Sequence, residues 1–223
     1  RISAVRANLE EQLRAAVINA KWTAGDIEIA SGARLSPISS DLADSVYEDS
    51  PAIWSELVNR DNLSGNSVKA RRDLLYRMLD HEEEQNLGIE GFPAERGLYE
   101  TLLKITGLHR QDADGIWRLL PPNEEHASKF LNIWNATKTL FKDAATRVSA
   151  MDIHDLWSAP PFGVRNGVKP VILIAFLLTH KGNVAVYKDG VFIPRLTDAD
   201  IDEYLQDARR FSMRWILIDK EKT

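Results

Sequence analysis

Cysteine is absent from the 223 residues of this chain. Its absence excludes disulfide bonds, thiolate zinc sites and cysteine nucleophiles, and it fits a reducing cytoplasm. Long apolar runs are also missing: the longest spans residues 171–178, whereas a membrane-spanning helix needs about 20 residues. The chain starts at Arg1 instead of methionine and has no basic-then-apolar leader. We therefore expect a cytoplasmic segment of a longer protein, with no membrane partner.

The sequence also lacks the common motifs of nucleotide, metal and hydrolase sites. None of its 12 glycines begins Gly-x-x-x-x-Gly-Lys-Ser/Thr, and Gly-x-Gly-x-x-Gly, His-Glu-x-x-His and Gly-x-Ser-x-Gly do not occur. The five histidines have no ligand spacing; they are His81, His109, His126, His154 and His180. We expect no catalysis, cofactor or metal in this chain. An enzyme would be favoured by a cleft of converging residues with strongly shifted pKa values; the candidates are Glu90, Glu95, His154 and Asp155.

An excess of positive charge is also lacking, since 28 basic side chains stand against 33 acidic ones. The formal net charge is −5, and residues 151–223 carry ten basic and ten acidic side chains, so the whole deficit lies in residues 1–150. A domain that binds nucleic acid through its overall charge is strongly basic, and neither part is. Contact with DNA would therefore need a local basic patch.

Hydrophobic periodicity predicts a helical domain over residues 1–150. Apolar residues recur there at three- and four-residue spacing, which is typical of amphipathic helices. Ser36-Pro37 is typical of a helix start, and Gly107 occupies the position of a C-cap glycine. The expected helices span about residues 2–22, 36–47, 51–58, 66–80, 94–106 and 127–141.

The pattern changes in residues 151–223, for which we predict an α+β domain. The expected elements are helices at 152–157, 168–180 and 197–210, strands at 184–188 and 191–193, and a third strand from Phe211. The first two strands flank Asp189-Gly190, the strongest short-range signal for a hairpin turn. Helix, helix and β-hairpin form the end of a winged helix. The predicted fold class is therefore mainly α with a C-terminal α+β winged-helix-like unit.

In a winged helix, the helix before the hairpin enters the DNA major groove. Here that helix, residues 168–180, is apolar on every face. Such a helix is typically buried, whereas a helix that reads DNA presents Arg, Lys, Asn or Gln to the bases. We therefore interpret it as core and the wing as a scaffold for protein contact. The alternative is DNA binding through local cations, for which the candidates are Arg72, Arg77, Lys188 and Arg195.

Two charged residues fall on predicted apolar helix faces: Arg71 in the helix 66–80 and Glu95 in the helix 94–106. A buried charge without a partner is costly, so we predict that the two form an ion pair, bidentate where the geometry allows it. The alternative is that the basic run around Arg71 binds a phosphate group. The acidic run at 81–84 would oppose an anionic ligand, and exposed charge runs are usually solvated.

Two stretches resemble segments of large bacterial ATP-binding proteins. The first contains Ser50-Pro51 to Asn59-Arg60, Leu63-Ser64, Ala70-Arg71-Arg72-Asp73-Leu74, and Leu87 to Arg96 with Tyr99-Glu100. The second contains Leu156 to Gly163, Gly167 to Val171, Val186-Tyr187, Gly190 and Phe192-Ile193-Pro194. This second stretch is similar to a segment downstream of the P-loop domain, in proteins some of which resemble the large ATPases of BREX-type phage-defence systems. The resemblance implies that an NTPase core lies in a parent domain outside this chain.

Together these observations predict a non-catalytic accessory module of a larger cytoplasmic P-loop ATPase. Its expected partners are the rest of the parent ATPase, other subunits or other proteins, and ATP and Mg²⁺ are expected only in the parent domain. The alternative is a DNA-binding winged-helix module of such an ATPase, acting in phage defence. Salt-sensitive DNA binding would separate the two, and the reading frame upstream of Arg1 should contain the P-loop motif.

Overall fold

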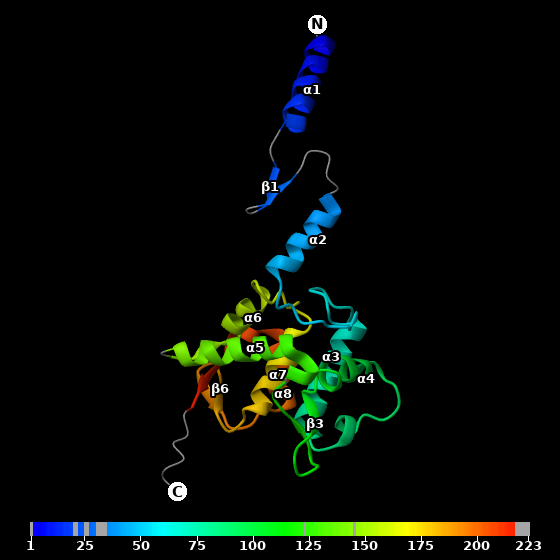
Figure 1. Ribbon diagram of the computed structural model, residues 1–223. Helices are drawn as coiled ribbons and strands as arrows, with labels where there is room; N and C mark the ends of the chain where they lie inside the picture. The colour runs from blue at the N-terminus through cyan, green and yellow to red at the C-terminus, as the bar shows by residue number, and fades with distance from the viewer. Residues whose placement is uncertain are drawn as a thin grey trace. The chain divides into compact units, whose positions relative to one another are not determined.

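The computed structural model describes residues 2–19, 22–24, 27–29, 35–122, 124–144 and 146–216, whose helices and strands are drawn in Figure 1. The chain consists of two compact units: an N-terminal unit, Arg1–Glu48, and a main unit, Asp49–Thr223. The described residues are mainly α-helical, with a β-sheet in the C-terminal part. None of their helices combines the length and the hydrophobicity needed to cross a membrane.

The N-terminal unit contains two helices and a small hairpin. In chain order they are α1 (Ile2–Asn19), β1 (Trp22–Ala24), β2 (Ile27–Ile29) and α2 (Leu35–Val46). The two strands pair antiparallel, with Thr23 opposite Glu28. The first predicted helix therefore ends earlier than expected, and the helical pattern did not predict the hairpin. Pro37 lies in the first turn of α2, where its missing N–H is tolerated.

The main unit begins with an irregular segment. The helix predicted from Pro51 is wrong, because residues 51–64 form turns, bends and irregular backbone. Asn59 Nδ2 donates to the carbonyl oxygen of Ile53 at 3.2 Å, so a side chain occupies an acceptor that a helix would use for its own backbone. The helix predicted next is confirmed as α3 (Gly65–Asp80).

The helix predicted to follow Pro93 is formed over residues 94–104, close to the predicted range 94–106. Helix α4 (Ala94–Tyr99) continues as a π-helical turn, Glu100–Lys104. Gly107 then has φ +69°, which is the left-handed conformation expected of a C-cap glycine. An antiparallel hairpin of β3 (His109–Gln111) and β4 (Trp117–Leu119) follows, inside the region predicted to be helical.

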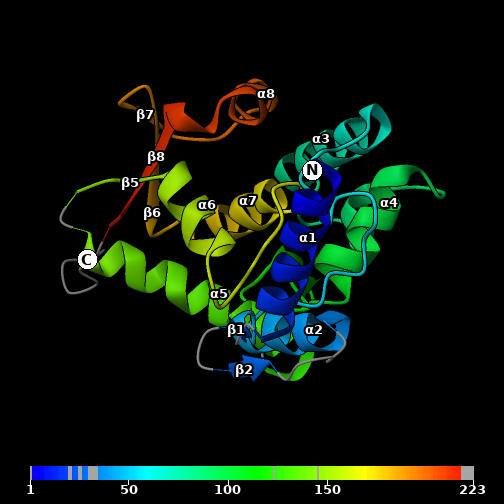
Figure 2. The same cartoon turned by 90° about the horizontal axis from the view of Figure 1, so that it is seen from above.

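The rest of the main unit mixes helices with a four-stranded sheet. Its elements are α5 (Glu124–Asp143), β5 (Val148–Ser149), α6 (Ala150–Ser158), α7 (Lys169–Thr179), β6 (Val184–Lys188), β7 (Val191–Ile193), α8 (Asp198–Gln206) and β8 (Phe211–Trp215). The predicted hairpin is confirmed: β6 and β7 pair around Asp189 and Gly190, whose φ angles of +49° and +82° suit a type I′ turn. The third strand is confirmed as β8. The antiparallel sheet has the order β5-β8-β6-β7, and Figure 2 shows β5 and β8 beside α6.

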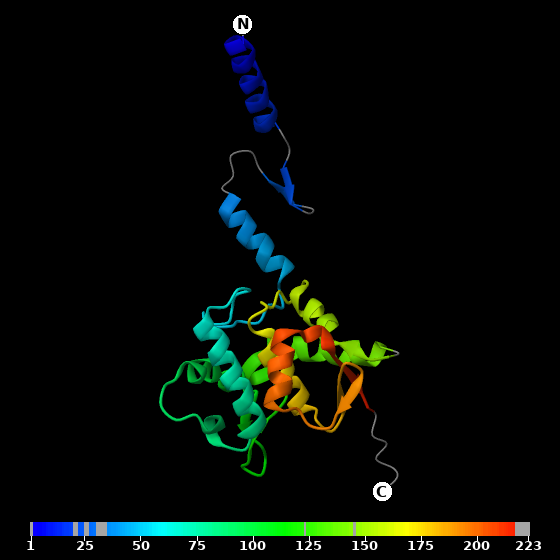
Figure 3. The same ribbon diagram turned by 180° about the vertical axis from the view of Figure 1, so that it is seen from behind.

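The hydrophobic core continues across the domain boundary predicted near residue 150. Strand β5 precedes it but pairs with β8, with Val148 opposite Met213. Trp157 on α6 donates from Nε1 to Thr137 Oγ1 on α5 at 2.8 Å. Helix α3 packs against both α7 and α8, and Figure 3 shows α3 in teal beside α8 in orange. The change in sequence pattern marks where the strands begin, whereas the hydrophobic core continues across it.

Candidate interaction surface

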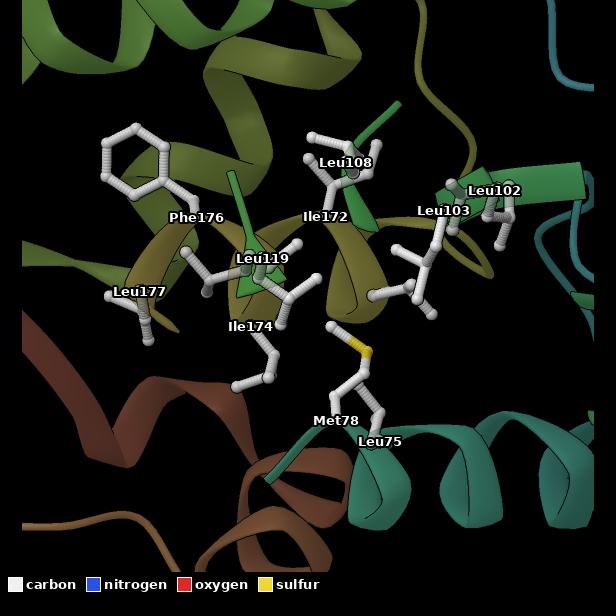
Figure 4. Close-up of a cluster of buried hydrophobic side chains, with 14 of the residues drawn as sticks. Leu75, Met78, Leu102, Leu103, Leu108, Leu119, Ile172, Ile174, Phe176 and Leu177 are labelled. Atoms are coloured by element: carbon white, nitrogen blue, oxygen red, sulfur yellow. The ribbon is translucent and has the colours of Figure 1, made fainter. Parts of the chain in front are cut away.

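Helix α7 is the helix that would read DNA in the predicted winged helix, and it is buried. Every residue from Lys169 to Leu177 is buried, as its apolar pattern predicted. Side chains of α3, of the π-helical turn and of the β3–β4 hairpin pack with those of α7 in one cluster (Figure 4); they include Leu75, Met78, Leu102, Leu103, Leu108 and Leu119. This described stretch therefore presents no side chain to DNA bases.

The predicted ion pair between Arg71 and Glu95 is not formed. Both residues lie in the described part of the chain, where Arg71 Nη1 donates to the carbonyl oxygen of Gly167 at 3.3 Å and the buried Nε of Arg71 has no hydrogen-bond partner. Burial lowers the pKa of Arg71. Arg71 therefore contacts the loop before α7, and α3 packs against α4, α7 and α8. Helical spacing placed Arg71 on an inward face but could not identify the opposing element.

Lys188, at the end of β6, is bound to α8. Its Nζ donates to Asp200 Oδ1 at 2.7 Å and to Glu203 Oε1 at 3.3 Å. The hydrogen bond to Asp200 raises the pKa of Lys188. Its charge is therefore compensated within the protein, which removes the lysine that the hairpin was expected to offer to a phosphate.

The three predicted arginine contacts lie in different surroundings. Arg77 Nη1 donates to the carbonyl oxygen of Gly88 at 3.3 Å. Arg72 is half-buried, and its buried Nε has no hydrogen-bond partner among the described residues. The side chain of Arg195 is 80% exposed, and its Nη2 lies 3.8 Å from Asp80 Oδ1. Contact of these arginines with nucleic acid stays a prediction.

His154 is held by a tyrosine instead of a carboxylate. Its Nε2 shares a hydrogen bond of 2.8 Å with the hydroxyl of Tyr204, and burial lowers the pKa of His154 to about 4. Within the described residues, neither Glu90, Glu95 nor Asp155 is among the hydrogen-bond partners of His154. The described residues also contain no group of three or more His, Asp or Glu side chains that could hold a metal ion.

Lys169 is a buried cation that the sequence pattern did not single out. It is 3% exposed at the start of α7. Its Nζ donates to Asn166 Oδ1 at 2.6 Å and to Ser158 Oγ, and burial lowers the pKa of Lys169. Because a buried ammonium needs acceptors, these contacts join the start of α7 to the end of α6. A lysine in a first helical turn ordinarily reaches solvent, so the sequence held no signal for its burial.

A groove lies beside the hairpin, and we call it the sheet-edge groove. It has a volume of about 830 Å³. Three segments form most of its walls: residues 79–84 at the end of α3, residues 184–186 of β6, and residues 192–196 after the hairpin turn. Ile216 also lines it, and the side chains of Phe192 and Ile216 are 52% and 44% exposed. The groove therefore combines an apolar floor with accessible side chains.

One wall of the sheet-edge groove is acidic. The side chains of Asp80, Glu83 and Glu84 are 54%, 70% and 57% exposed. Glu82 is mostly buried and is paired with Lys181 at 3.0 Å. Among the lining residues, four carboxylates face two permanent cations, Lys181 and Arg195. The exposed excess of negative charge favours a cationic ligand.

The sheet has an incomplete edge at this groove. Strand β6 pairs with β8 over all five residues from Val184 to Lys188, but with β7 only from Val186 onward. Among the described residues, Val184 and Ala185 therefore have no strand partner on the side of β7, and both line the groove. Pro194 follows β7 and cannot donate a ladder hydrogen bond.

Comparison with known proteins finds no family model, curated protein sequence or solved structure that matches this chain.

Proposed function

We propose that this chain is a non-catalytic interaction module that mediates protein contacts within a larger cytoplasmic P-loop ATPase. The burial of α7 carries the proposal: all residues from Lys169 to Leu177 are covered by other parts of the protein, so the helix supports packing instead of reading bases. The ATPase context rests on the resemblance of the two stretches within residues 50–100 and 156–194 to segments of such proteins. Binding of ATP and Mg²⁺ belongs to the parent domain in this proposal.

The proposal includes a winged-helix-like fold for residues 124–216. Its support is the chain order α5, β5, α6, α7, β6 and β8, together with the position of β8 between β5 and β6. Strand β7 and helix α8 form an insertion between the two long strands of this arrangement. Helix α3 packs on α7, where DNA would otherwise lie. A fold does not determine function, and here the covering layer favours protein contact.

DNA binding is the competing function, and a titration distinguishes it. Fluorescence anisotropy of a labelled DNA duplex, measured at about 50 mM and about 200 mM salt, reports binding through phosphates because such binding weakens steeply with salt. We expect no salt-sensitive binding at micromolar protein. Salt-sensitive binding that is lost in Arg195→Glu would contradict the proposal and favour the DNA-binding alternative.

The ATPase context has its own test. This chain and the P-loop domain of its parent protein would be produced as separate polypeptides and mixed. We expect them to elute together in size-exclusion chromatography, because an interaction module should hold its parent domain without a covalent link. Separate elution at concentrations well above the micromolar range would contradict the proposed context.

A further inference from the structure

We propose that Asn166 is a deamidation site controlled by the fold. Deamidation proceeds when the contact between Gly167 and Arg60 opens, and the isoaspartate product prevents that contact from forming again. This inference is independent of the proposed function. It concerns the only Asn-Gly pair in the sequence, residues 166–167.

Deamidation of an asparagine begins at the backbone nitrogen of the residue that follows it. This nitrogen loses its proton to solvent and forms a bond to Cγ of the asparagine. The bond from Cγ to Nδ2 breaks, and Nδ2 takes a proton from solvent and leaves as ammonia. Water then opens the resulting succinimide ring at either carbonyl carbon, which gives aspartate or isoaspartate. Glycine in the second position favours the reaction because it has no side chain to hinder the attack.

Water reaches Asn166, but the attacking nitrogen is not free. Asn166 is exposed, whereas Gly167 is buried. The N–H of Gly167 donates to the carbonyl oxygen of Arg60 at 3.0 Å. A nitrogen held in this hydrogen bond keeps its proton, so the contact must open before the reaction can start. The rate is therefore proportional to the population of the locally open state.

The side chain and the backbone of Asn166 are also held. Its Oδ1 accepts from the buried Nζ of Lys169 at 2.6 Å, and its N–H donates to Asp61 Oδ1 at 3.1 Å. Asp61 also accepts from Arg165 at 3.2 Å. Rotation of the side-chain amide toward the next backbone nitrogen would break its hydrogen bond to Lys169. The fold therefore restrains both groups that must meet.

Close packing around Gly167 determines the effect of the product. A Cβ atom at Gly167 would lie 2.2 Å from the carbonyl oxygen of Val58. Isoaspartate lengthens the main chain between residues 166 and 167 by one carbon atom. A site with no room for a methyl group has no room for this longer backbone. Because ammonia is lost, the resulting separation of residues 58–61 from the start of α7 is permanent.

The rate of deamidation tests the role of the fold. The whole chain and a synthetic peptide of residues 163–171 are incubated in the same mildly alkaline buffer and digested with pepsin at acidic pH, where the reaction is slow. Mass spectrometry measures the fraction of residue 166 converted from amide to carboxylate. We expect conversion in the whole chain to be slower by about tenfold or more, because only the open state reacts. In concentrated guanidinium chloride the two rates should be equal. Equal rates without denaturant would overturn the proposal.

Variants of Asp61 test the opening step. Asp61→Ala removes the acceptor for the N–H of Asn166, so conversion in the folded chain should be about three- to tenfold faster. Asp61→Asn keeps an acceptor oxygen and should restore most of the protection. The control Glu56→Ala removes an exposed carboxylate from the same 51–64 segment and should leave the rate unchanged. Circular dichroism verifies that each variant is folded. Equal rates for Asp61→Ala and Glu56→Ala would contradict the proposal.

The product has a separate readout. Ion exchange separates the isoaspartate form of the incubated chain from the unmodified form, and mass spectrometry then follows backbone hydrogen exchange. In the isoaspartate form, exchange should be faster at residues 58–61 and 167–172. Asn166→Asp reproduces the other product; its carboxylate can still accept from Lys169, so exchange should stay close to that of the unsubstituted chain. Unchanged exchange in the isoaspartate form would refute the predicted loss of the contact.

Discussion

At the scale of single residues, Gly167 joins two loops that the sequence places more than a hundred positions apart. Its N–H donates to the carbonyl oxygen of Arg60 at 3.0 Å, and its own carbonyl accepts from Arg71. A Cβ atom at this position would lie 2.2 Å from the carbonyl oxygen of Val58. Only glycine allows this approach of backbone to backbone.

Replacing this glycine should destabilise the main unit. Gly167→Ala places a methyl group against two backbone carbonyls, so we expect a loss of about 2–3 kcal/mol in the free energy of unfolding. Urea denaturation followed by circular dichroism measures it. The control is Gly97→Ala in α4, where a Cβ meets nothing within 4 Å and helix propensity should raise stability by up to about 1 kcal/mol. Similar effects of the two substitutions would contradict this account of Gly167.

His154 makes stability depend on pH. Burial lowers its pKa from 6.5 to about 4 in the folded chain, so between these values the unfolded chain binds more protons than the folded one. The contribution of His154 is therefore present above pH 6.5 and is lost as pH falls toward 4, by about 3 kcal/mol at most.

The variant His154→Gln isolates this contribution, since glutamine can still hydrogen bond to Tyr204 but does not titrate. The free energy of unfolding should fall more steeply in the unsubstituted protein than in His154→Gln when pH is lowered from 7 to about 4.5. His109 and His180, whose pKa values burial also lowers, are common to both proteins and cancel in the comparison. Parallel curves would show that His154 does not titrate in this range.

At the scale of secondary structure elements, the sequence predicted structure that a short local motif specifies, but it did not predict contacts that lack such a motif. The β6–β7 hairpin was predicted because Asp189-Gly190 specifies its own turn. The β3–β4 hairpin was missed because its strands are three residues long and carry charges at Arg110 and Arg118, with no two-residue turn between them. The hydrogen-bond partner of Arg71 was missed for a different reason. It is the backbone carbonyl oxygen of Gly167 in a distant loop. Every residue type carries such a carbonyl, so the identity of residue 167 does not reveal the contact.

The contribution of helix α3 to the stability of the protein should come mainly from the side chains on one of its faces. Leu75 is fully buried in the cluster with α7, whereas Val68, on the same helix, is 42% exposed. Leu75→Ala should lower the free energy of unfolding by about 2–5 kcal/mol because it leaves a cavity. Val68→Ala should change it by less than about 0.5 kcal/mol. Equal losses in chemical denaturation would place the contact face of α3 elsewhere.

At the scale of the whole molecule, the composition of the sequence suggested a domain boundary near residue 150, but the hydrophobic core extends across that position. The net charge and the strand pattern both change near residue 150, yet helices and strands from both sides share one hydrophobic core. The compact units divide at Glu48 instead. Charge is a property of the surface and strand content is a local property, so neither reports which elements pack together.

This division predicts how fragments behave. A chain that starts at Asp49 should unfold cooperatively, with the same free energy as the corresponding transition of the full chain to within about 0.5 kcal/mol. A chain of residues 151–223 should show no cooperative transition, because it lacks β5 and the core residues of α3 and α5. Urea titrations followed by tryptophan fluorescence measure both. Cooperative unfolding of residues 151–223 would restore the boundary that the sequence suggested.

The central place of β8 in the sheet also matters for how this protein is made. Phe211–Trp215 is the last strand in the chain, yet it joins β5 to β6. On the ribosome, 66 further residues must be translated after Ser149 before that sheet can close, and at about 5–20 residues per second this takes about 3–13 seconds. During that interval the edge of β5 has no strand partner, so the nascent chain exposes a strand edge to chaperones for several seconds.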